Sequence, residues 1–110
     1  MWANYDYSTF PLVYVKFNQY IKDEEDFNNF LKRWTFLYHD KKDFTFIFNT
    51  VEVSAPNISY CFKMRTFIKK LKKFPHQYLQ KSIIIVSNTY IRYLLNLIFL
   101  FQKPVAPVYI

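Results

Sequence analysis

The sequence predicts an α/β domain in which a largely parallel sheet packs against helices. Short apolar runs of strand character alternate three times with stretches whose apolar residues recur every three to four positions. This alternation implies right-handed crossovers between parallel strands. The length of 110 residues suits one core, and 52% hydrophobic with 21% charged residues is typical of a folded chain. We expect an N-terminal arm over residues 1–11 and one domain over residues 12–110.

The first strand and helix are predicted between residues 12 and 39. The β-branched and aromatic run Leu12–Phe17 is typical of a strand. Asp23 can cap a helix, and the acids at positions 23–26 complement the positive end of the helix dipole. The apolar face of this helix consists of Phe27, Phe30, Leu31, Trp34, Leu37 and Tyr38. The pattern fails near residues 39–42, where basic side chains suit a helix C-terminus.

The second strand and helix are predicted between residues 44 and 75. The nearly continuous apolar run Phe44–Asn49 indicates a strand covered on both faces. After a connection that contains Pro56, a helix capped by Asn57 or Ser59 is expected. Its apolar stripe is Cys61, Met64, Ile68 and Leu71. Pro75 ends it, because proline cannot continue a helix.

The third strand and helix, and a final strand, complete the pattern. Ser82–Val86 is a strand, and Asn88 or Thr89 caps a helix that runs to about Gln102. The apolar side of that helix consists of Ile91, Leu94, Leu95, Ile98 and Phe101. Residues 105–110 are expected to form a short edge strand, because Pro107 lacks the amide that a central strand needs.

Composition excludes several classes of site. The chain has no glycine, so glycine-rich phosphate loops and dinucleotide fingerprints are absent. The single Cys61 excludes an internal disulfide and a cysteine-based zinc site, and fits a reducing compartment. Only His39 and His76 could supply imidazole, and no nucleophile–base set can be assembled around them. No secretory signal or span-length apolar stretch is visible. We expect a cytoplasmic, non-catalytic protein without metal or cofactor.

The charges are divided unevenly along the chain. Residues 1–60 hold six basic and eight acidic side chains, whereas residues 61–110 hold nine basic and no acidic ones. The predicted basic surface of the second helix consists of Lys63, Arg65, Lys69, Lys70, Lys72 and Lys73. A basic amphipathic helix can lie on an anionic membrane or track nucleic-acid phosphates. The simpler interpretation is a solvated helix face, and no stacking signature of a nucleic-acid fold favours nucleic acid.

The segment around the second strand resembles the signature region of STAS domains. The residues that carry the resemblance are Phe46-Ile47-Phe48-Asn49, then Val51-Glu52-Val53-Ser54, then Asn57-Ile58-Ser59-Tyr60 before a helix. STAS domains are the anti-sigma-factor antagonists and the cytoplasmic domains of sulphate transporters. In that family a core strand ends in Asp or Asn, and a loop leads to Asp-Ser-Ser-Gly at a helix start. The resemblance implies a protein-binding domain in which Ser59 is a candidate phosphorylation switch.

A second stretch is similar to CRAL-TRIO lipid-exchange domains, which share the same general fold. It comprises Phe74-Pro75-His76-Gln77-Tyr78-Leu79, then Ile84-Ile85-Val86 with Asn88, then Lys103-Pro104. That family's lipid cavity requires a longer chain with an additional helical region. This resemblance implies lipid or anionic membrane-surface binding as the alternative function.

Two interpretations of Asn57 and Ser59 stay open. Either they form a phosphorylation-controlled interaction site, where a phosphate would meet free amides at the helix N-terminus, or they cap the helix. Asn57, Ile58 and Tyr60 replace the Asp, the first Ser and the Gly of the STAS motif, which favours the cap.

The expected function is a non-catalytic protein–protein interaction or structural module. Its surface would include residues 54–60 and the basic helix, and aromatic residues of the N-terminal arm such as Trp2 and Tyr5 could add a contact. Phe, Tyr, Asn, Lys and Ile supply 53 of 110 residues, all with AT-rich codons, as in some large DNA viruses. A component of a larger assembly, such as a viral particle, and a homo-oligomer are both compatible with this expectation.

Overall fold

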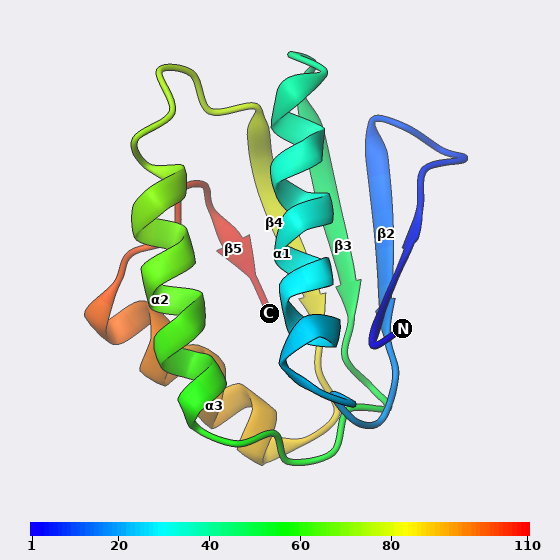
Figure 1. Ribbon diagram of the computed structural model, residues 1–110, viewed down its shortest axis with the longest axis vertical. Helices are drawn as coiled ribbons and strands as arrows, with labels where there is room; N and C mark the ends of the chain where they lie inside the picture. Colours follow the sequence, from blue (N-terminus) through cyan, green and yellow to red (C-terminus); the bar gives the residue numbers. More distant parts are fainter.

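One five-stranded sheet organises the molecule, in the order β1-β2-β3-β4-β5. The computed structural model describes all residues from 1 to 110 (Figure 1). Its elements are β1 (Ala3–Asp6), β2 (Leu12–Phe17), α1 (Glu24–His39), β3 (Phe44–Asn49), α2 (Ser59–Leu71), β4 (Leu79–Ile85), α3 (Thr89–Phe101) and β5 (Val108–Tyr109). Only the β1–β2 pair is antiparallel. The predicted α/β class with a mostly parallel sheet is therefore confirmed.

All three helices lie on one face of the sheet. Each crossover from β2 onward steps to the next strand in the same direction, and right-handed crossovers of that kind put every helix on the same side. In Figure 1, α1 lies in front of β3 and β4, and α2 stands beside β5. The buried strand side chains beneath the helices are Ala3, Val13, Val15, Phe17, Phe44, Phe46, Phe48, Leu79, Ser82 and Ile84. The result is a two-layer sandwich with one sheet face left uncovered.

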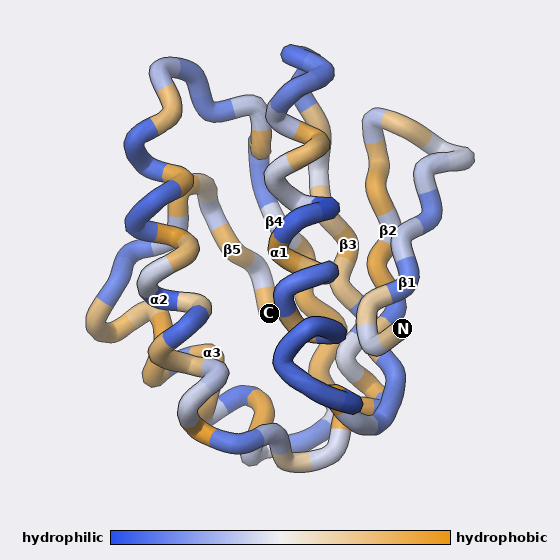
Figure 2. The backbone as a smooth tube through the Cα atoms, in the orientation of Figure 1, coloured by the Kyte–Doolittle hydropathy of each residue, from blue (hydrophilic) through white to orange (hydrophobic).

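The first helix forms as its sequence predicts. Asp23 is the N-cap, and its Oδ1 accepts a hydrogen bond from the Asp26 amide at 2.8 Å. Along its predicted apolar face only Leu31 is less than fully buried. Figure 2 shows hydrophilic turns on the outward side of this helix, in front of strands that are largely hydrophobic. Cap, dipole and apolar period therefore act together in placing α1.

Aromatic rings fill the space between α1 and the sheet. The Trp34 ring lies 4.9 Å from Phe46 and 5.1 Å from Phe67, measured between centroids. Phe46 in turn stacks on Phe48 at 4.5 Å. Such edge-to-face and offset pairs add specific geometry to the hydrophobic burial.

The strand β3 is covered on one face only, which corrects the prediction of double coverage. Phe44, Phe46 and Phe48 are buried, whereas Thr45, Ile47 and Asn49 alternate with them and are partly exposed. The phenylalanines occupy the inner positions, and the outer positions are less apolar than the run suggested. A continuous apolar run predicts two buried faces, but only one face of this sheet has helices to cover it.

The N-terminal residues contribute a strand that the sequence pattern missed. Residues 3–6 pair antiparallel with β2, and the Trp2 amide donates to Asp26 Oδ1 at 2.7 Å. The Tyr5 hydroxyl donates to the Phe30 carbonyl oxygen at 2.7 Å. The Trp2 and Tyr5 rings pack against the core, so they are not free anchors for a partner. A four-residue strand with one buried alanine carries too little pattern to be recognised alone.

The strand boundaries on the other side of the sheet also differ from expectation. The strand β4 begins three residues before Ser82, and a register irregularity lies opposite the Phe44/Thr45 step of β3. The strand β5 covers only Val108 and Tyr109 of the predicted residues 105–110. It pairs with β4 alone, which confirms the predicted edge position.

Candidate functional site

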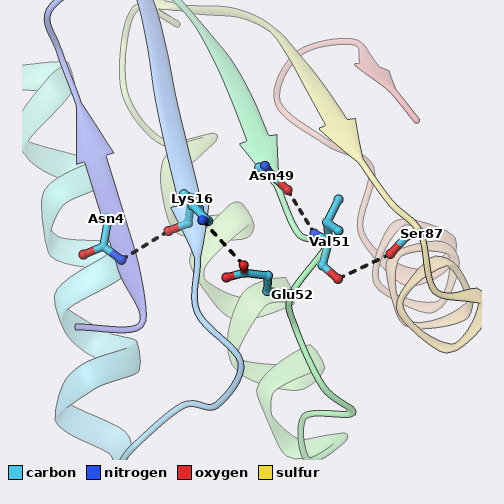
Figure 3. Close-up of polar contacts among 6 residues, drawn as sticks. All are labelled: Asn4, Lys16, Asn49, Val51, Glu52 and Ser87. Carbon is cyan, nitrogen blue, oxygen red and sulfur yellow. Dashed lines mark hydrogen bonds and ion pairs between the residues drawn. The ribbon is translucent and has the colours of Figure 1, made fainter.

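The loop after β3 leads to the predicted site, and polar contacts fix its first residues, Val51 and Glu52. The Asn49 Oδ1 accepts from the Val51 amide at 3.0 Å, and the Ser87 hydroxyl donates to the Val51 carbonyl at 3.3 Å (Figure 3). On the other side, Lys16 Nζ lies 3.6 Å from Glu52 Oε1. The loop is thus tied both to β2 and to the segment between β4 and α3.

Asn57 closes the turn that begins α2. Its Oδ1 accepts from the Ser59 amide at 2.9 Å, while Ile58, the residue at the helix boundary, makes no side-chain capping bond. Asn57 and Ser59 are both exposed, and Ser59 takes part in the turn through its amide and not its hydroxyl. Of the two predicted caps, Asn57 is the one that supplies a bond. Phosphorylation of Ser59 stays a prediction.

The predicted basic surface of α2 is divided between different surroundings. Lys63 lies 2.6 Å from Glu24 Oε1 of α1 and 5.2 Å from the centre of the Tyr60 ring. It therefore links two helices and is not part of a free cationic patch. The remaining lysines of the set, Lys69, Lys70, Lys72 and Lys73, are exposed.

Arg65 lies between two exposed aromatic rings. Its guanidinium carbon is 4.4 Å from the centre of the Phe62 ring and 4.7 Å from that of Phe101. The exposed fractions are 52% for Phe62, 63% for Phe101 and 76% for the neighbouring Leu100. We define these four residues, Phe62, Arg65, Leu100 and Phe101, as the aromatic–cationic patch.

The exposure of Phe101 corrects its predicted place on the buried side of α3. Ile91, Leu94 and Ile98 are buried as predicted, but Phe101 is the last residue of the helix. The Phe101 ring lies on Arg65 of α2 and is not packed into the core. Helical spacing alone cannot indicate where the covering neighbours end.

The uncovered side of the sheet carries an apolar row of side chains that sequence reasoning missed. Tyr14, Ile47, Ile83 and Tyr109 are paired in register across four strands and so form one continuous row. We call this side the open sheet face; it consists of Asn4, Asp6, Leu12, Tyr14, Lys16, Thr45, Ile47, Asn49, Lys81, Ile83, Ile85 and Tyr109. Of the row, Tyr14, Ile83 and Tyr109 are exposed. The alternation within Leu12–Phe17 was the one available signal for it.

An apolar cavity of about 150 Å³ lies between the sheet and the helices. Twenty-two of its 25 lining residues are hydrophobic, and they come from all three helices and from both chain ends. Trp2 and Trp34 are among them, and the indole Nε1 of each has no hydrogen-bond acceptor. Cys61 also lines it, and burial raises the pKa of this thiol, in keeping with an apolar setting. The lining of the cavity is therefore almost entirely apolar, and no set of polar side chains points into it together.

No group of three or more His, Cys, Asp or Glu side chains is placed to hold a metal ion. His76 Nε2 lies 3.7 Å from Asp43 Oδ1, but both side chains are more than half exposed. An exposed pair of this kind lacks the desolvation and the third, orienting group that catalytic histidines use.

Comparison with known proteins returned no match: no family model, no curated protein and no solved structure is similar to this chain. None of the three helices combines the length and the apolar content needed to cross a membrane. The geometry of the two exposed surfaces is therefore the basis for assigning a function.

Proposed function

We propose that the protein is a non-catalytic protein–protein interaction module that binds through the open sheet face, and that its occupant is a second copy of the chain. The observation that carries this proposal is the apolar row Tyr14, Ile47, Ile83 and Tyr109 on the side of the sheet without helices. Parallel sheets occur almost only with both faces covered. A second sheet supplies the missing layer.

The strand order allows a symmetric pairing. Because β3 is the middle strand of five, a two-fold axis along β3 places β2 of one copy over β4 of the other. Tyr14 then faces Ile83 of the second copy, and the reciprocal contact forms at the same time, as an isologous interface requires. Sheets packed face to face at about 10 Å interdigitate such side chains.

The charge distribution favours this face for contact between two cationic molecules. The strands carry only Asp6, Lys16 and Lys81, and Glu52 lies beside Lys16. These four charges cancel, although the whole chain has a net charge of +7. Two copies therefore meet here without the like-charge repulsion that α2 would cause.

Sedimentation velocity over a range of concentrations tests the proposal. The wild-type protein should self-associate reversibly, and Ile83→Lys should weaken association at least tenfold, because the added charge enters a two-fold interface twice. Phe36→Lys is the control, since Phe36 is an exposed apolar residue on α1, away from the sheet. A monomer at all concentrations, or equal losses in both variants, would overturn the proposal. Circular dichroism verifies that each variant is folded.

The predicted loop surface and the predicted family remain part of the proposal. The order from β2 to β5 supports a STAS-like arrangement, and the exposed Asn57 and Ser59 lie where that family's motif would be. If a protein partner binds residues 54–60, the Ser59→Asp variant should lose binding to that partner while its self-association stays unchanged. A cytoplasmic location and a place in a larger assembly remain predictions.

A further inference from the structure

We infer that the aromatic–cationic patch docks the protein on an anionic lipid bilayer. This function is separate from self-association, because the patch lies on α2 and α3 whereas the open sheet face is the side of the sheet without helices. The two surfaces therefore use different residues and can be tested independently.

The apolar part of the patch is unusually accessible. Leu100 is the most exposed large hydrophobic residue of the chain, at 76%, and Phe101 and Phe62 are each more than half exposed. The Arg65 guanidinium lies over the Phe62 and Phe101 rings and so links the two aromatic side chains. Leucine and phenylalanine tips surrounded by cations are the side chains that interfacial membrane contacts use.

The charges around the patch are all positive. Arg65 belongs to it, and Lys69 follows one helical turn later on α2. Lys72 is the C-cap of that helix, and Lys103 lies two residues beyond Phe101. No acidic residue occurs after Glu52. The one carboxylate that approaches α2, Glu24, pairs with Lys63 and leaves these cations unneutralised. Each cation near an anionic lipid surface strengthens binding about fivefold.

A bilayer fits this surface better than a nucleic acid does. Sequence-tolerant nucleic-acid binding needs free aromatic faces on which bases stack. Here the guanidinium of Arg65 already occupies one face of each ring, and the most exposed member, Leu100, can neither stack nor bind phosphate. In a bilayer the apolar side chains of the patch would enter the hydrocarbon, and the cations around them would contact the anionic headgroups.

Co-sedimentation with lipid vesicles tests the inference. The full chain should bind vesicles that contain about 30% phosphatidylserine in phosphatidylcholine, and not phosphatidylcholine alone, with affinity that falls as salt rises. The double change Lys69→Gln and Lys72→Gln should weaken binding about 25-fold. Lys41→Gln with Lys42→Gln removes two charges that are also exposed but lie beyond the end of α1, and should weaken vesicle binding little.

The apolar contribution has its own matched pair. Phe101→Ser should weaken vesicle binding at least tenfold, whereas Phe36→Ser should leave it unchanged, because both rings are 63% exposed but only Phe101 lies in the patch. Equal losses in the two serine variants, or in the two lysine pairs, would show non-specific adsorption and overturn the inference. Stronger binding to a poly-uridine oligonucleotide than to the vesicles would assign the patch to nucleic acid instead. Circular dichroism of each variant excludes unfolding as the cause.

Discussion

Filling the apolar cavity from Cys61 should stabilise the protein. Cys61 is buried on α2 and lines the cavity of about 150 Å³. Cys61→Leu adds about 50 Å³ of side chain, and at roughly 24 cal/mol per Å³ of cavity this is worth about 1.2 kcal/mol. Two added carbons at about 0.8 kcal/mol each give a similar gain. The melting temperature should rise by about 5 °C.

The assay is thermal and urea unfolding of the variant beside two comparison variants. Thr66→Leu tests the better helix propensity of leucine at an exposed position of the same helix, and should gain only a few tenths of a kcal/mol. Cys61→Ser places a hydroxyl in the apolar site and should cost about 1–3 kcal/mol. A lower melting temperature for Cys61→Leu would refute the reasoning, because overpacking would then outweigh filling and the space beside Cys61 would be closed.

Three further predictions concern single contacts. Ser59→Asp should leave stability unchanged or raise it by about 0.3–1 kcal/mol in urea unfolding, since the first turn of α2 has no acid; a clear loss would contradict this. Burial raises the pKa of Tyr38 to about 12, above that of the unfolded chain, so stability should be intact below about pH 10 and fall as the pH rises toward 12. In Tyr38→Phe this alkaline loss should shrink, although losing the bond to Gln77 costs about 1 kcal/mol at neutral pH; an unchanged pH profile would exclude Tyr38 as its source. Lys63→Gln should cost at most about 0.5 kcal/mol, because the Glu24 carboxylate is largely exposed, and a loss above 2 kcal/mol in urea would refute that.

Local chemistry was sufficient to predict the helices. Asp23 ahead of an apolar period, Asn88 before α3 and Pro75 after α2 mark the helix ends, and each signal acts within one or two turns of its own residue. The order of the parallel strands and helices follows from the same short-range patterns. The sequence therefore determined the α/β class and most of the buried face of each helix by itself.

Tertiary structure decided which apolar residues remain exposed. Alternation gives every strand two faces, but whether the second face is covered depends on strand order and on the direction of all the crossovers together. Ile47 and Ile83 are as apolar as their buried neighbours, and only the one-sided placement of the helices leaves them on an open face. Phe101 keeps helical spacing with Ile98 but is exposed, with its ring on Arg65 of α2 and not in the core. Both candidate surfaces thus depend on how segments far apart in the sequence are placed, because a local alternation such as that of β2 marks two strand faces but not which one is covered.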